Sequence, residues 1–186
     1  MRVAIYDKNP GAGAAQWGLK LSWAIGCFLH KLFGKLDAYY GAESWDDAFS
    51  WLEQRPGLLT SIQYWGHGSP GTVWLAGKSV DRAYFKKLVG KIPPNGVLWF
   101  RTCSTFQGQA GYDISKYLTT LLNCTVAAHT RIIGVLQGGL HTRAPNQEPS
   151  WPLTEGEFPK SFWAGLGLKI GNNTILCLRA SIPKGW

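Results

Sequence analysis

A histidine and a cysteine in this chain each follow directly after an apolar stretch. Residues 61–66 (SIQYWG) lead to His67-Gly68, and residues 96–102 (GVLWFRT) lead to Cys103. Both stretches have the length and the apolar character of a buried strand. In an open parallel sheet, ligands bind at the carboxyl ends of the strands. If these two strands are neighbours, the imidazole and the thiol face each other across one crevice, which is the minimum equipment for nucleophilic catalysis.

The chemistry of such a pair assigns one role to each side chain. The thiolate is the reactive form of cysteine, and a neighbouring imidazolium lowers the pKa of the thiol, so Cys103 is the candidate nucleophile. His67 is the candidate general acid and base. The alternative for any cysteine is that of a small buried hydrophobe. That alternative is favoured for the three that lie inside apolar stretches, which are Cys27, Cys124 and Cys177.

Strand-like and helix-like segments alternate along the chain. Strands are predicted at residues 2–7, 36–41, 61–66, 96–102, 125–130 and 174–180, and helices at 14–33, 44–55, 81–89 and 112–122. Small hairpins are predicted at 72–80, turning on Gly77-Lys78, and around Gly138-Gly139. This alternation predicts a mainly parallel sheet with helices on both faces. Because no linker or repeat divides the sequence, we expect one domain over residues 1–186, a three-layer α/β/α sandwich.

The bulk composition narrows the function classes. With 45% apolar and 16% charged residues the chain is expected to fold. The net charge of +8 favours an acidic partner. However, the basic residues are scattered, with no run longer than Lys86-Lys87, and no zinc-finger or RNP motif occurs, so a solvated basic surface is preferred over nucleic-acid binding.

The location of the protein is predicted from its cysteines and its apolar segments. The cysteines form no CxxC pair and no secretory signal is recognised, so reduced thiols and a cytoplasmic location are expected. Residues 19–33 are too short and too often interrupted to span a membrane, and they are expected to form a core helix.

The two motifs together resemble those of the caspase-like cysteine peptidases, which include caspases, gingipains, separase and self-processing toxin proteases. The signature of that superfamily is an apolar strand that ends in His-Gly, followed by a second that ends in a small residue and Cys. Here these are Tyr64-Trp-Gly-His67-Gly68 and Trp99-Phe-Arg-Thr102-Cys103, 36 positions apart from histidine to cysteine. The order of elements also fits over about residues 2–143, which leaves 144–186 as a C-terminal extension. The stretch from His67 to Leu75 resembles uncharacterised bacterial members.

The resemblance implies specific roles for residues around the pair. It implies a dyad without a third acidic residue, with the backbone N–H groups of Gly68 and Cys103 holding the oxyanion. The residue two before the cysteine lines the S1 pocket in such enzymes, and here it is Arg101, whose guanidinium fork suits an acidic P1 side chain. Arg143 is a second candidate, because caspases carry a substrate-binding arginine in the stretch after the fifth strand. The alternative for Arg101 is that it points to solvent.

Rival motifs are incomplete. A P-loop reading of residues 13–18 is broken by Leu19, and Gln16 stands where a dinucleotide fingerprint needs glycine. A Cys-x5-Arg phosphatase loop from Cys103 would need arginine at Gln109. Cys27 and His30 have no second ligand pair that would complete a zinc site.

We therefore expect a cysteine endopeptidase that cleaves a protein or peptide substrate and needs no metal or cofactor. The alternative is a non-catalytic caspase-like module that binds a protein or peptide in the same groove. Retention of both His67 and Cys103 favours the enzyme, because a module needs neither. A basic nucleic-acid binder is the weakest of the three possibilities.

Overall fold

The centre of the fold is a six-stranded sheet in the order β10-β8-β7-β3-β1-β2. A computed structural model describes residues 1–11, 13–157, 171 and 173–185 of the chain. Neighbouring strands run parallel except for β10, which is antiparallel to β8. The six strands are β1 (Arg2–Asp7), β2 (Ala38–Ala42), β3 (Ser61–Trp65), β7 (Val97–Arg101), β8 (Thr125–His129) and β10 (Leu140–Arg143). The expected mixed α/β architecture with a mainly parallel sheet is confirmed.

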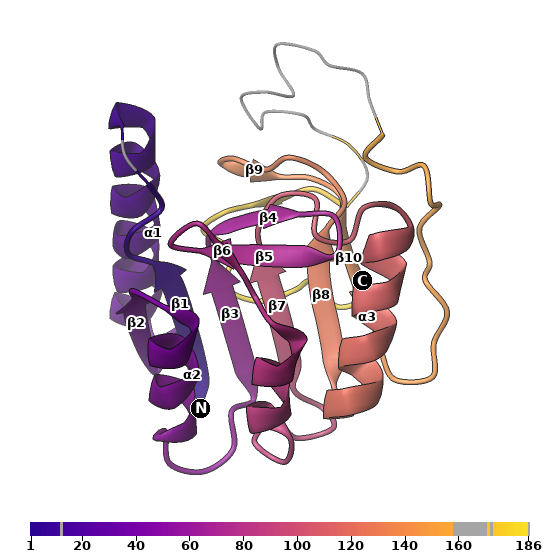
Figure 1. The fold of residues 1–186 in the computed structure, drawn as a ribbon, viewed down its shortest axis with the longest axis horizontal. Coiled ribbons are helices and arrows are strands. Elements are labelled where there is room, and N and C mark those ends of the chain that lie inside the picture. Colours follow the sequence, from indigo (N-terminus) through magenta and orange to yellow (C-terminus); the bar gives the residue numbers. More distant parts are fainter. Residues whose placement is uncertain (12, 158–170, 172, 186) are drawn as a thin grey trace.

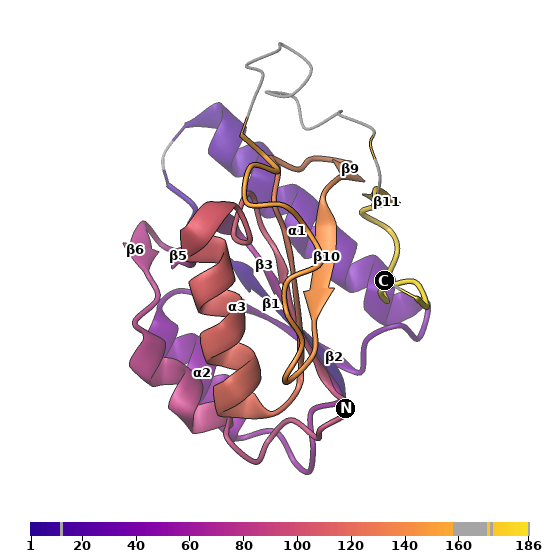
Figure 2. The ribbon, with the colours of Figure 1, turned by 90° about the vertical axis from the view of Figure 1, so that its right-hand side faces the viewer.

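Helices cover both faces of the sheet (Figures 1 and 2). One face carries α2 (Trp45–Glu53), the 3-10 helix η1 (Arg82–Leu88) and α3 (Gly108–Leu122). The opposite face carries α1 (Ala14–Leu32) and the C-terminal segment, which includes β11 (Ile175–Leu176). Part of the predicted C-terminal extension, residues 158–170, lies outside the described residues. We call the two sides of the sheet the α3 face and the α1 face.

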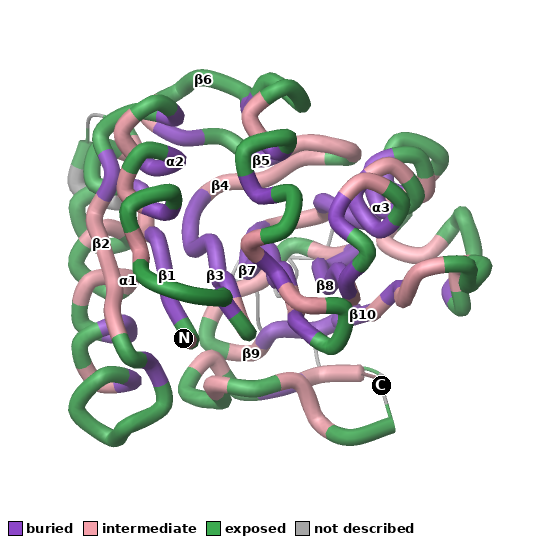
Figure 3. Tube along the Cα trace, turned by 90° about the horizontal axis from the view of Figure 1, so that it is seen from below, coloured by how far each residue is buried: buried purple, intermediate pink, exposed green. Residues whose placement is uncertain are grey.

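Side chains alternate between the two faces along each central strand. Along β7, Leu98 and Phe100 belong to the apolar core on the α3 face, while Trp99 and Arg101 point to the α1 face. The same alternation holds along β3 and β8. The central strands that contribute to the large core on the α3 face are coloured as buried in Figure 3.

Local sequence signals account for where the α3-face helices begin and end. The hydroxyl of Ser44 accepts a hydrogen bond from the backbone of Asp47 (3.1 Å), as an N-cap should, and α2 ends before Pro56 as predicted. α3 begins at Gly108, earlier than predicted, and ends at Asn123 in the left-handed conformation. The segment predicted as a helix at 81–89 is a 3-10 helix, whose first turn is capped by Asp81.

A small three-stranded antiparallel sheet crosses above the ends of β3 and β7 (Figure 1). Its strands are β4 (His67–Ser69), β5 (Thr72–Leu75) and β6 (Lys78–Ser79). The predicted hairpin is confirmed, but its turn is formed by Ala76 and Gly77, which have φ values of 50° and 75°. It therefore lies one residue earlier than expected.

Two predictions near the C-terminus are wrong. The segment around Gly138-Gly139 is not a hairpin: β10 joins the central sheet beside β8, whereas β9 (Leu136–Gln137) pairs with β11. The strand predicted at 174–180 is reduced to β11, because the carbonyl groups that follow it accept hydrogen bonds from buried side chains instead of a partner strand. In the part of the chain that the structure describes, no helix is long and apolar enough to cross a membrane.

Candidate active site

The two motifs lie on adjacent parallel strands. β3 and β7 pair from Ser61↔Val97 to Trp65↔Arg101. Continuing this register by two residues places His67 opposite Cys103, just beyond the carboxyl ends of both strands. Both residues are partly buried, so neither belongs to the core. The expected adjacency of the two strands is confirmed, and the pair lies where ligands bind in sheets of this kind.

Gly68 brings the two strand ends into close contact. A Cβ atom on Gly68 would lie 2.6 Å from the carbonyl oxygen of Cys103 and 2.8 Å from Cβ of Thr102. Real side chains do not approach this closely, and the first of these atoms belongs to the backbone, so any other residue would push the strand ends apart. Glycine is therefore needed after the histidine for a packing reason, whatever the chemistry.

The loop after the cysteine is held rigidly. Ser104 has a left-handed backbone with φ 53°, and its N–H donates to the carbonyl of Arg131 (3.0 Å). The hydroxyls of Thr102 and Thr105 are hydrogen-bonded to each other at 2.7 Å. The backbone N–H of Cys103 donates to no acceptor among the described residues, so it is free to hold a developing oxyanion.

His67 contacts α1. Its Nε2 lies 3.0 Å from the side-chain oxygen of Gln16, and its ring meets Trp23 edge-on at 5.5 Å between centroids. The oxygen of an amide can only accept, so Nε2 carries the proton and Nδ1 is the basic nitrogen. In the sequence, Gln16 stands out only as the residue that breaks a nucleotide-binding motif. Its distance from His67 along the chain, 51 positions, left no local signal of this contact.

Cys103 contacts a different loop. Its Sγ accepts a hydrogen bond from the backbone N–H of Ile133 (3.5 Å) and lies 3.9 Å from the carbonyl oxygen of the same residue. Burial raises the pKa of the Cys103 thiol, and the Ile133 hydrogen bond opposes that rise in part. No hydrogen bond joins Cys103 to His67 among the described residues. The lowered pKa expected from an imidazolium neighbour is therefore absent in this conformation.

An acidic group that the sequence analysis did not single out lies near the histidine. Asp7, at the end of β1, is fully buried and accepts hydrogen bonds from the backbone N–H groups of Asn9 (2.9 Å) and Ala76 (3.1 Å). Burial raises the pKa of Asp7, while these hydrogen bonds and the nearby His67 lower it. β1 is the neighbour of β3 on the side opposite β7. A carboxylate at the end of the predicted first strand was therefore the feature of the sequence that could have indicated an acid near His67.

Arg101 lies on the expected face of the sheet but is enclosed within the protein. It is 2% exposed, with its guanidinium between the rings of Trp65 (4.2 Å) and Trp99 (4.4 Å). Its donors bind the side chains of Gln63 and Gln137 and two main-chain carbonyls of the C-terminal segment. The alternative that it points to solvent is wrong. Contact between Arg101 and a substrate remains a prediction, and it requires the C-terminal segment to move.

The structure does not bring Arg143 to the same place. Arg143 pairs with Val126 along β10, on the level of Leu98 and so roughly 16 Å below Cys103 at strand spacing. Its guanidinium donates to the carbonyl of Tyr112 and to the hydroxyl of Ser115, both on α3. It is thus buried on the α3 face, where it ties β10 to a helix. A substrate contact of Arg143 remains a prediction, and in this structure its guanidinium is bound on the α3 face instead.

No protein-family model matches the sequence, and no curated protein matches it at a significant level. Function is therefore inferred from the groups at the carboxyl edge of the sheet. This edge combines a thiol, an imidazole and a free backbone N–H, which together are the parts of a site for acyl transfer.

Proposed function

We propose that this protein is a cysteine endopeptidase of the caspase-like kind, with Cys103 as nucleophile and His67 as general acid and base. The observation that carries the proposal is the register of β3 and β7, which sets the two residues opposite each other at the carboxyl edge of the sheet. The close contact of Gly68 with Cys103 and the free N–H of Cys103 support it. The caspase-like order of helices and strands is consistent with this proposal.

The reaction follows from the positions of the groups. The Cys103 thiol transfers its proton to Nδ1 of His67, and the sulfur attacks the carbonyl carbon of the scissile peptide bond. The resulting oxyanion accepts a hydrogen bond from the N–H of Cys103. The carbon–nitrogen bond then breaks as the imidazolium gives its proton to the leaving amine. Water, deprotonated by His67, hydrolyses the thioester and restores the thiol.

Two contacts of the free protein bear on this cycle. The side-chain oxygen of Gln16 accepts a hydrogen bond from Nε2–H of His67 and so stabilises the imidazolium that forms during attack. The thiol must leave its contacts with Ile133 to reach the substrate carbonyl, and a neutral, buried thiol is a resting state that substrate has to activate. Catalytic hydrogen bonds are often long in free enzymes and tighten when substrate is bound.

The test is covalent labelling with an electrophilic peptide, followed by mass spectrometry of the modified residue. We expect one adduct, on Cys103, and loss of both labelling and peptide hydrolysis in Cys103→Ala and His67→Ala. Cys177→Ala is the matched control, because Cys177 is also partly buried but lies far along the chain in the C-terminal segment. Hydrolysis at the wild-type rate by Cys103→Ala would sink the proposal.

A second candidate is favoured by a specific observation. The side chains of His67 and Cys103 are each engaged by other partners, Gln16 and Ile133. A non-catalytic module that binds a peptide in this cleft would look the same. Under this alternative, wild type and Cys103→Ala bind the peptide with the same affinity, and neither of them cleaves it.

A further inference from the structure

Polar side chains form a continuous row across the α1 face, next to the candidate active site. The order of the row is His30 of α1, Trp65 of β3, Arg101 and Trp99 of β7, and His129 of β8. Successive members are in ring or cation–π contact, with separations of 4.2–6.4 Å. We call these five residues the polar row. Because side chains two positions apart share a strand face, the row lies directly before His67 and Cys103.

The C-terminal segment is bound to this row through its main chain. Four successive carbonyl groups accept hydrogen bonds from buried side chains of the α1 face. Arg101 donates to the carbonyls of Cys177 and Arg179, Gln63 donates to that of Ala180 (2.8 Å), and Nε2 of His30 lies 3.1 Å from that of Leu178. We call residues 175–180 the strap. Residues 177–180 are thus recognised by their backbone carbonyls and not by their side chains.

The row carries a positive charge that no ion pair among the described residues neutralises. Arg101 is fully buried, yet none of the ion pairs among the described residues includes it. Its acceptors are neutral amides and carbonyls. Burial lowers the pKa of Arg101 to about 9, and the nearby Cys177 and Cys27 oppose this only in part. A carboxylate would give this guanidinium a charge-assisted, two-pronged hydrogen bond that carbonyl groups cannot supply.

Buried nitrogens without partners lie beside the same charge. In the described part of the chain, three buried side-chain nitrogens have no hydrogen-bond partner: Nδ1 of His30, Nε1 of Trp99 and Nε2 of His129. Because the other nitrogen of each histidine ring faces a carbonyl oxygen and carries the proton, the two histidine nitrogens in this set are acceptors, and the unpaired donor is the indole N–H of Trp99. Buried polar atoms are almost always paired, so an unpaired donor beside a buried charge needs an explanation. A carboxylate that pairs with Arg101 and accepts from the indole of Trp99 explains the donor and the charge together.

We propose that the polar row is a binding site for an acidic peptide side chain, and that the strap occupies this site in cis until such a peptide displaces it. This inference rests on the proposed function for the position of the peptide along the cleft. An Asp or Glu side chain in contact with Arg101 places the adjacent backbone next to Cys103. The strap is then an internal competitor that makes cleavage conditional on an acidic residue.

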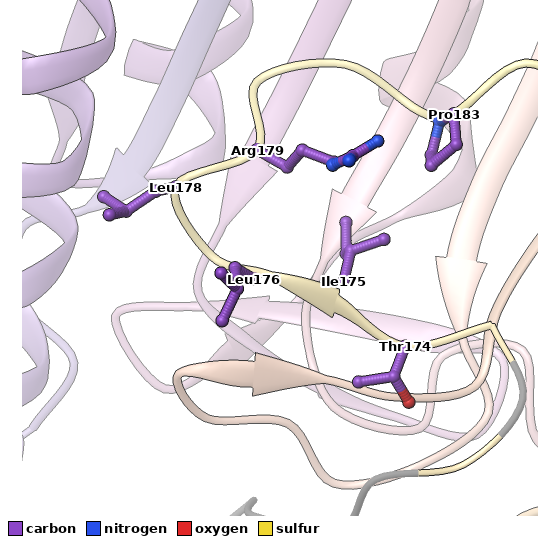
Figure 4. Close-up of a pocket in the computed structure, with 6 residues that line it drawn as sticks. All are labelled: Thr174, Ile175, Leu176, Leu178, Arg179 and Pro183. Carbon is purple, nitrogen blue, oxygen red and sulfur yellow. The ribbon is translucent and has the colours of Figure 1, made fainter.

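The strap contacts the central sheet on one side and pairs with β9 along one edge, while several of its side chains remain exposed, as suits a displaceable segment. Ile175 packs against Trp99, Ala127 and Leu140, but Leu176 and Leu178 are 55% and 62% exposed. An open hollow of about 620 Å³ lies against the segment, which curves so that Arg179 and Pro183 face each other across it (Figure 4). The contacts with the sheet are thus a single apolar anchor and the four captured carbonyls.

The first experiment measures whether acidic peptide and strap compete. It uses the Cys103→Ala protein, so that nothing is cleaved, and two blocked peptides that differ only in Asp against Asn. Hydrogen exchange of the strap is followed by mass spectrometry, since the N–H of Cys177 is bonded to Val135 (2.9 Å) and reports docking. Saturating Asp peptide should accelerate exchange in the strap, and the Asn peptide should not. Equal exchange with both peptides overturns the inference.

The second experiment loosens the strap and measures binding by calorimetry in the same background. Ile175→Ala removes the buried anchor, whereas Leu178→Ala, on the exposed side of the same segment, is the matched control. We expect Ile175→Ala to tighten binding of the Asp peptide at least about tenfold, because a larger fraction of molecules has an open site. Leu178→Ala and the Asn peptide should show no change, and adding Arg101→Gln should abolish the gain.

The outcomes separate this inference from the proposed function. If wild type does not cleave peptides but the Asp peptide still displaces the strap, the site exists and only the peptidase assignment falls. If wild type cleaves peptides and Ile175→Ala binds Asp and Asn peptides equally, the strap is merely structural and the inference falls alone.

Discussion

The two faces of the central sheet differ in what they bury. On the α3 face the strands contribute Ile62, Leu98, Phe100 and Val126 to one continuous apolar core. On the α1 face the same strands bury Gln63, Arg101 and His129, along with three nitrogens that have no partner among the described residues. An unsatisfied buried polar group costs about 1–3 kcal/mol, so the second face is a poor way to gain stability.

This contrast separates the residues that stabilise the fold from those that can take part in function. Successive side chains of one strand point to opposite faces of the sheet, so adjacent residues can have different roles. The α3 face holds the sheet together, and the α1 face with its carboxyl edge carries the groups that can do chemistry. Paired substitutions along β7 and β8 test this division directly.

The largest effect is expected from Cys103→Ala. If Cys103 is the nucleophile, kcat/KM for peptide hydrolysis should fall at least about 10³-fold. The free energy of unfolding should change by less than about 1–2 kcal/mol, because a small, partly buried side chain leaves little cavity. Steady-state kinetics and urea denaturation measure the two quantities. A large loss of stability with retained activity would show that Cys103 supports the fold and is not the nucleophile.

The opposite result is expected three residues earlier. Phe100 is buried on the α3 face and packs edge-on against Phe85, with 6.0 Å between ring centroids. Phe100→Ala should lower the free energy of unfolding by about 3–5 kcal/mol. Activity per folded molecule should be unchanged. Phe33→Ala, whose side chain is 69% exposed, is the control and should be nearly neutral. Similar losses in both variants would contradict the core assignment.

The α1 face should also make stability depend on pH. Burial lowers the pKa of His129 to about 3, although its hydrogen bond to Gly138 opposes this. Because the folded pKa lies below that of the unfolded chain, the unfolded state binds the proton first, and stability falls as the pH drops below about 6.5. At pH 5 the loss from His129 is about 2 kcal/mol. Burial and Arg101 lower the pKa of His30 to about 4, which adds in the same direction.

Urea denaturation between pH 7.5 and 5 measures this slope for wild type and for His129→Phe. The variant should lose the part of the slope that belongs to His129, whatever its stability at pH 7.5. An unchanged slope would mean that His129 has the same pKa in the folded and the unfolded protein.

The strands and the helix cap that form the α3 face can be predicted from local patterns in the sequence. The strands at β3 and β7 are apolar runs bounded by polar or glycine-rich sequence, and Ser44 is a recognisable helix cap. The placement of His67 and Cys103 follows from those two strands alone. These features depend on a few consecutive residues, so they can be predicted without knowledge of the rest of the chain.

The arrangement of the α1 face depends on contacts between segments that are distant in the sequence. Arg101 is buried because a segment 76 positions later covers it, and no local sequence pattern predicts this contact. Residues 174–180 have the composition of a strand, but their carbonyls are bound by side chains, which periodicity does not predict. The face of Arg143 is set by the antiparallel register of β10. Gln16 meets His67 only because α1 crosses the edge of the sheet.

The smallest expected effect concerns that last contact. The side-chain oxygen of Gln16 accepts a hydrogen bond from Nε2–H of His67. This contact favours the tautomer that leaves Nδ1 free to deprotonate the thiol. Gln16→Ala should lower kcat by about tenfold, because the imidazole loses its orientation and the imidazolium its acceptor, while KM should change little. Gln16→Glu should restore the rate, since a carboxylate also accepts from Nε2. Gln109→Ala, at an amide that contacts only Asp113 among the described residues, is the matched control. If the alanine and glutamate variants lose activity equally, or if KM rises while kcat is kept, Gln16 contributes to the shape of the cleft and not to the state of His67. The dyad would then act without a third side chain, and the functional residues of the α1 face would be confined to the sheet.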